Sequence, residues 1–105
     1  MPLSPMDVVN EIRLMWNEWK AIPFPAGYGG KDIDGICLTS LDTFAAGCID
    51  TFICRKGRLD KHRVAVMESC KNDLEVVVPS LKGDAHTYFN NLLLLSKRVL
   101  QLVGR

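Results

Sequence analysis

The sequence lacks any apolar run long enough to cross a membrane. A transmembrane helix needs roughly 18 consecutive apolar residues, and no segment of this 105-residue chain approaches that length. The first residues also lack the basic and apolar segments of a secretory signal. We therefore expect a cytoplasmic protein without a membrane segment, whose cysteines stay reduced.

An excess of charge of either sign is missing as well. The chain has 13 Lys and Arg residues against 12 Asp and Glu residues, for a formal net charge of +1. This balance gives no overall argument for binding to nucleic acid or to a membrane surface. Apolar residues make up 48% of the chain, which is too many for a disordered protein. Length and composition predict one globular domain over residues 1–105.

The residue patterns of common metal and redox sites are also missing. The four cysteines contain no C-x-x-C pair, so neither a zinc ribbon nor a thioredoxin-type site is indicated. No Glu has a His three residues later, the spacing of bundle metalloenzymes. Carboxylates avoid the apolar faces of the predicted helices, so no buried acid or base is expected. We therefore expect no cofactor, no metal ion and no enzymatic activity.

A thiol- or metal-dependent enzyme is the least favoured alternative. Cys54 is the candidate reactive thiol, because it lies on the polar side of its helix beside two cations that would stabilise a thiolate. A metal site across helices would need Cys48, Cys70 and His86, which share no metal-binding motif. We expect Cys48 and Cys70 to fill the core as small apolar residues.

Four segments carry apolar residues at helical spacing. The links that follow the second and third segments are short, which implies antiparallel neighbours. The sequence therefore predicts an all-α, single-domain four-helix bundle, mostly antiparallel. Its helices are expected over residues 5–21, 38–56, 60–78 and 84–103.

Residues typical of helix ends flank these segments. Ser4 is expected to cap the first helix, Asp60 the third and Asp84 the fourth. Gly57 is the expected left-handed residue that ends the second helix.

A long Pro/Gly-rich loop separates the first two helices. It runs from Pro23 to Gly35, beyond the usual length of a helix–helix turn. Within it, Asp34 is expected to help start the second helix. Three apolar side chains of the loop are expected to cover the core: Phe24, Tyr28 and Ile33.

The second helix contains a patch of small residues, Ala45 to Cys48, between Phe44 and Phe52. Both phenylalanines fall on its apolar stripe and are expected to be buried. Gly47 costs a helix about 1 kcal/mol relative to Ala. We expect close packing of another helix against Gly47 to offset this cost.

A cationic segment joins the second and third predicted helices. Residues 55–63, here called the basic turn, hold five cationic residues and one acid, whereas residues 1–50 are net acidic. Cations in the first turn of a helix oppose its dipole, which favours contact with an anion. Arg63 falls on the apolar stripe, so it is expected either to find a partner such as Asp50 or to reach water. The candidate contact residues are Arg55, Lys56, Arg58, Lys61 and Arg63.

The leading functional hypothesis is a helical-bundle adaptor or regulator that acts through protein–protein contacts with an unidentified partner. A homodimer is a further hypothesis, because the fourth helix is apolar over half its circumference and Leu94 interrupts its polar half. The alternative is a nucleic-acid or phosphate-binding module that uses the basic turn. Nucleic acid is the less favoured partner, since a charge run alone is weak evidence for it.

Overall fold

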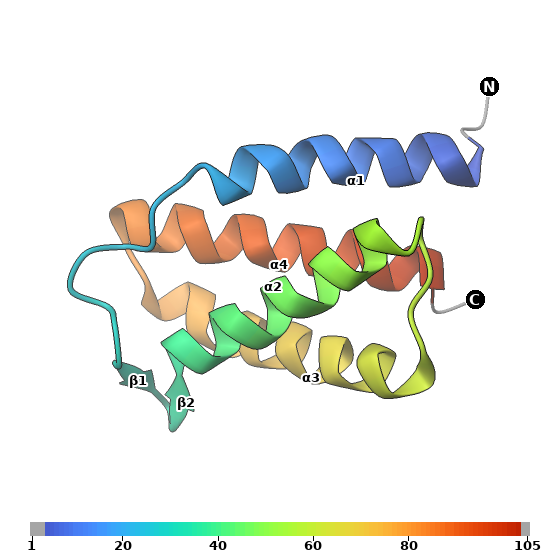
Figure 1. Ribbon diagram of the computed structural model, residues 1–105. Helices are drawn as coiled ribbons and strands as arrows, with labels where there is room; N and C mark the ends of the chain where they lie inside the picture. The colour runs from blue at the N-terminus through green and yellow to red at the C-terminus, as the bar shows by residue number, and fades with distance from the viewer. Residues whose placement is uncertain (1–3, 104–105) are drawn as a thin grey trace.

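The protein is an up-and-down bundle of four helices, described over residues 4–103 by a computed structural model (Figure 1). The all-α fold class is therefore confirmed, and every helix end lies within two residues of its predicted position. No helix among residues 4–103 is both long enough and apolar enough to span a membrane. The helices are α1 (Pro5–Lys20), α2 (Leu38–Cys54), α3 (Lys61–Val77) and α4 (Gly83–Val103), with a short 3₁₀ turn at Val78–Ser80.

Side chains cap two of the helices as predicted. The Ser4 hydroxyl accepts from the Asp7 amide and the Asp7 carboxylate accepts from the Ser4 amide, both at 3.2 Å. Asp60 accepts from the Arg63 amide at 3.3 Å at the start of α3. The prediction that Asp84 caps the fourth helix is wrong, because α4 begins one residue before it. The chain turns into α4 at Gly83, which has a φ of 59°, so Asp84 falls in the first turn.

The second helix ends with two residues of positive φ. Lys56 has a φ of 57° and Gly57 has a φ of 94°, so Gly57 takes the kind of conformation that the sequence predicted, with Lys56 preceding it in the left-handed region. The amides of Lys56 and Gly57 donate to the carbonyls of Ile53 and Phe52, at 3.1 and 2.8 Å. The positive φ of Gly57 favours glycine, and a Cβ there would also lie 2.8 Å from a methyl group of Val9. This glycine lets the link after α2 approach α1.

The loop between α1 and α2 crosses one end of the bundle and carries a small hairpin that the sequence analysis missed (Figure 1). Strand β1 (Asp32–Ile33) pairs antiparallel with β2 (Ile36–Cys37). Asp34 and Gly35 form the turn, with φ values of 51° and 80°, as a type I′ turn requires. Asp34 therefore does not start α2, and that expectation is wrong. The three apolar loop side chains do pack against the core as predicted: Phe24, Tyr28 and Ile33.

Helix α4 packs against α1, α2 and α3. These three neighbours account for the unusual width of its apolar face. Leu94 remains exposed on the outer side of α4. Ser96 is fully buried, and its hydroxyl donates to the Leu92 carbonyl at 2.8 Å.

Helix α2 crosses the bundle diagonally and buries only part of the patch expected to pack (Figure 1). Ala45, Cys48 and Phe52 are buried, as predicted. Phe44 is instead 60% exposed, and the space beside Gly47 is open within 4 Å, so both expectations are wrong. The line of contact follows Ala45 and Cys48, and Phe44 and Gly47 both lie on one side of it, turned away from the core.

Candidate functional site

A hollow of about 380 Å³ lies between the start of α2, the hairpin and the middle of α3. Its walls combine apolar side chains with two thiols, and a carboxylate stands at α3. We call this hollow the α2–α3 groove. The residues that define it are Ile36, Cys37, Leu41, Phe44, Val66 and Cys70.

Phe44 is the most informative residue of the groove. Single exposed apolar side chains are normal on a protein surface, and Leu14 on α1 is one, at 65% exposed. Phe44 differs because its exposed ring lines a hollow that has an apolar wall in Val66. An aromatic side chain beside a hollow is typical of a surface that receives another side chain. The sequence placed Phe44 in the core and missed this role.

Cys37 is the N-cap residue of α2 and lies at the hairpin end of the groove. Its side chain forms no cap hydrogen bond. The Ser40 hydroxyl and amide favour the thiolate and lower the pKa of Cys37, against the opposing effects of burial and of Asp32. Cys37 was not among the thiols that the sequence singled out as reactive. The available signal was a cysteine directly before a helix with a serine three residues later.

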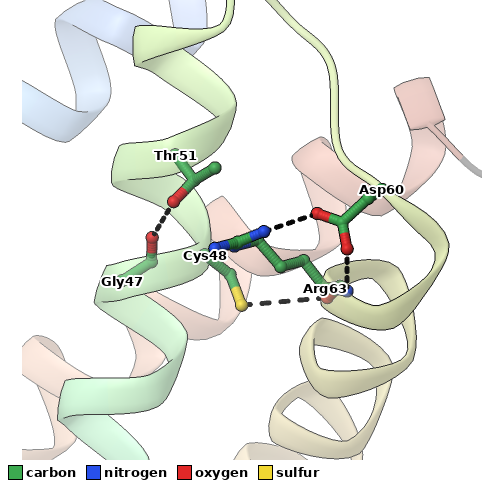
Figure 2. Close-up of polar contacts among 5 residues, drawn as sticks. All are labelled: Gly47, Cys48, Thr51, Asp60 and Arg63. Atoms are coloured by element: carbon green, nitrogen blue, oxygen red, sulfur yellow. Dashed lines mark hydrogen bonds and ion pairs between the residues drawn. The ribbon is translucent and has the colours of Figure 1, made fainter.

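The other cysteines occupy the environments that the sequence predicted. Cys54 is exposed, whereas Cys48 and Cys70 are buried and serve as core fillers. The Cys48 thiol donates to the Arg63 carbonyl at 3.7 Å (Figure 2). Burial raises the pKa of Cys48, and it raises the pKa of Cys70 to about 11. Within residues 4–103 no three His, Cys, Asp or Glu side chains gather as metal ligands, so Cys48, Cys70 and His86 do not form the site considered above.

The basic turn lies at the end of the bundle where α1 begins and α4 ends (Figure 1). Arg63 is held by Asp60, whose carboxylate oxygen lies 2.7 Å from the guanidinium (Figure 2). The guanidinium lowers the pKa of Asp60. Arg63 therefore has a local partner other than Asp50. The four remaining cations are exposed and form no ion pair with any residue of the described chain: Arg55, Lys56, Arg58 and Lys61.

A half-buried carboxylate contradicts the expectation that no acid is buried. The Tyr88 hydroxyl of α4 donates to Asp42 of α2 at 2.7 Å. Burial raises the pKa of Asp42 and, together with the Asp42 carboxylate, raises the pKa of Tyr88. Tyr88 also accepts a hydrogen bond from the Trp19 indole at its carbonyl, at 3.1 Å. This cluster ties α1, α2 and α4 together and has a structural role.

A larger hollow of about 610 Å³ lies between α3 and α4, and its lining is mostly charged or amide-bearing. Lys71 and Glu75 in its wall pair with each other at 3.6 Å. Mixed charges that pair locally are typical of a solvated face. The α2–α3 groove is therefore the better candidate for a binding site.

Comparisons with protein-family models, with curated proteins and with solved structures find no match to this chain.

Proposed function

We propose that this protein is a binding module, an adaptor or regulator, that docks a protein partner in the α2–α3 groove. The observation that carries the proposal is the 60% exposure of Phe44 on the wall of that groove. The proposed role is binding and not catalysis.

The charges near the groove define the class of partner. Asp73 lies in its α3 wall, and the hairpin beside it carries Asp32 and Asp34. An amphipathic helix with an apolar face and cationic flanks would match this combination. We therefore propose a cationic amphipathic helix as the docked element.

Phe44→Ala is expected to weaken binding of such a helix about tenfold. Complete burial of a phenylalanine side chain contributes about 1.5–3 kcal/mol. Since roughly 60% of the Phe44 side chain is exposed in the free protein, a bound helix that covers it would gain about 1–2 kcal/mol. Amphipathic helical peptides are selected by display against the wild-type protein. Their dissociation constants for both proteins are then measured by fluorescence anisotropy.

Leu14→Ala is the matched control, since Leu14 is equally exposed but lies on α1 outside the groove. Its affinities should equal those of the wild type. Both substitutions are at exposed positions, so thermal unfolding should change little. Equal peptide affinities for Phe44→Ala and wild type would falsify the docking proposal.

A second copy of this chain is a further proposed partner. The support is the exposure of apolar residues such as Leu94 and Phe44, since the wide face of α4 is covered within the bundle. Light scattering across a concentration series tests the proposal. A strict monomer at every concentration would end it.

The second candidate function is binding of phosphates, including those of nucleic acid, by the basic turn. Its support is the cluster of exposed cations at one end of the bundle that lack carboxylate partners within residues 4–103. Each phosphate contact contributes roughly 0.7–0.9 to the slope of log affinity against log salt.

The triple substitution of Arg55, Lys56 and Arg58 to Ala is expected to weaken binding to heparin and oligonucleotides and to reduce that slope by about 2. Salt-gradient elution and anisotropy titrations measure the effect. The triple substitution of Lys20, Lys31 and Lys82 to Ala changes the net charge equally and serves as the control. Equal losses in the two triple variants would show a general charge effect and contradict a site at the basic turn.

We also propose that the protein resides in the cytoplasm. The support is its four free cysteines, because a reducing compartment keeps thiols in this form.

A further inference from the structure

We infer that Cys37, and not Cys54, is the reactive thiol of this protein. The structure indicates that Cys37 exchanges with neutral or cationic low-molecular-weight disulfides and that the resulting mixed disulfide lies in the α2–α3 groove. This inference concerns the thiol itself and does not require that a protein partner docks in the groove.

The backbone and one side chain prepare Cys37 for this chemistry. It immediately precedes the first residue of α2, so its sulfur lies at the positive end of a 17-residue helix. Ser40 adds a hydroxyl and an amide that stabilise a negative sulfur. Cys37 is partly exposed, so a small disulfide can reach it. Helix N-termini and donated hydrogen bonds are the usual means by which proteins activate a thiol.

The groove offers a second, unpartnered thiol and space for an adduct. Cys70 is 5% exposed and lines the same groove. Its sulfur has no hydrogen-bond partner within the described chain, whereas the Cys48 thiol donates to a carbonyl. Together with Val66 and Phe44, Cys70 forms a soft, polarizable wall. The volume of about 380 Å³ equals that of about a dozen liquid water molecules at roughly 30 Å³ each, which is ample for half of a small disulfide.

The charge around the sulfur differs between the two solvent-accessible thiols, Cys37 and Cys54. Asp32 pairs with Cys37 across the hairpin, Asp34 lies in its turn and Asp73 lines the groove. The cation Lys31, next to Asp32 in the chain, lies over the Tyr28 ring at 5.3 Å. This net negative charge disfavours an anionic disulfide and attracts a cationic one.

Cys54 has the opposite surroundings. It is exposed and is followed directly by Arg55 and Lys56 at the end of α2. The negative end of the α2 dipole lies at this sulfur, whereas the positive end lies at Cys37. The cationic neighbours should attract an anionic disulfide, so the two thiols are expected to rank the same reagents in opposite order.

The proposed reaction is a thiol–disulfide exchange. The Cys37 thiolate attacks one sulfur of a disulfide R–S–S–R, the Cys37–S–S–R bond forms, and the original S–S bond breaks. The departing R–S⁻ takes a proton from water. Cys37 is oxidised and the released half is reduced, so no further oxidant is needed. Where a partner docks as proposed above, the R group would occupy the same groove and block it.

The test measures adduct formation by intact-mass spectrometry on the full chain at neutral pH and low salt. The probes are cystamine, 2-hydroxyethyl disulfide and oxidised glutathione, which are cationic, neutral and anionic. The variant Cys54→Ser reports on Cys37, and Cys37→Ser reports on Cys54. With cystamine, Cys37 should react about tenfold faster than Cys54, although Cys54 is the more exposed.

The order of the three probes supplies an internal control. Cys37 should prefer cystamine to oxidised glutathione, and Cys54 should prefer oxidised glutathione, with both preferences weakened by salt. Ser40→Ala should slow the reaction of Cys37 and leave that of Cys54 unchanged. Faster reaction of Cys54 with all three probes, or a preference of Cys37 for oxidised glutathione, would overturn the inference. Peptide binding by the Cys37→Ser variant is measured separately, so failure of the docking proposal is distinguishable from failure of this one.

Discussion

Trp19→Ala is expected to lower the free energy of unfolding by about 3–5 kcal/mol, the usual cost of removing a large buried aromatic side chain. Trp19 is buried and stacks on Trp16 with ring centroids 5.4 Å apart. Its ring also lies 4.8 Å from that of Tyr88, and its indole donates to the Tyr88 carbonyl. The substitution removes this packing together with the indole hydrogen bond. Urea unfolding followed by circular dichroism measures the loss.

Trp19→Phe separates the two contributions. It retains an aromatic ring and loses the indole donor, so its cost should be smaller than that of Trp19→Ala by at least about 1 kcal/mol. Leu14→Ala on the outer face of the same helix should be near neutral. A cost below about 1 kcal/mol for Trp19→Ala would show that α1 is not held to α4 as the structure describes.

Asp42→Ala is expected to cost about 1–3 kcal/mol, because it leaves the hydroxyl of Tyr88 without its acceptor. Tyr88 is only 5% exposed, so water is poorly placed to replace the carboxylate. Adding Tyr88→Phe to Asp42→Ala should recover part of the loss, since no buried hydroxyl then lacks a partner. Urea unfolding of the two single variants and the double variant measures the coupling.

Comparison of Asp42→Asn with the wild type tests how the stability provided by the contact between Asp42 and Tyr88 depends on pH. Burial raises the pKa of Asp42 above its ordinary 3.8 in the folded protein. The folded state therefore binds this proton more tightly than the unfolded state. The resulting stabilisation is fully present below pH 3.8 and is lost as the pH rises through the folded pKa.

Asparagine keeps an acceptor for Tyr88 and carries no charge at any pH. At pH 7 Asp42→Asn should be at least as stable as the wild type, and its advantage should shrink as the pH falls toward 3.8. Urea unfolding at a series of pH values measures the difference. An advantage that grows with acidification would contradict the assignment of a raised pKa to Asp42.

The helices could be predicted from the sequence because the signals that begin and end each helix lie within a few residues of one another. Caps such as Ser4 and Asp60 act within one helical turn, and Pro79 follows α3 closely enough to end it in a 3₁₀ turn. The hairpin before α2 was missed although Asp34-Gly35 is a strong turn signal. Its strands are two residues each, too short to show an alternating pattern.

The candidate site could not be predicted in the same way. The apolar spacing placed Phe44 on the same face as Ala45 and Cys48. Adjacent residues lie about 100° apart around a helix, so a broad apolar face includes a residue at its edge, such as Phe44, that the neighbours do not cover. The sequence also favoured Cys54 as the reactive thiol, from its cationic neighbours alone. The predicted helix start at residue 38 already placed Cys37 directly before α2, but only the structure showed that Cys37 lines a groove beside the hairpin.

The sequence by itself determined the number of helices, their ends within two residues, the burial of Cys48 and Cys70, and the exposed basic turn. These features depend on periodicity, capping and charge, which act over a few neighbouring residues. Only the tertiary structure decided that Phe44 lines a groove, that Asp42 meets Tyr88 across the bundle, and that Arg63 is held by Asp60. The physical reason is that periodicity defines a broad apolar face, whereas the path of α2 across its neighbours selects which residues of that face are covered.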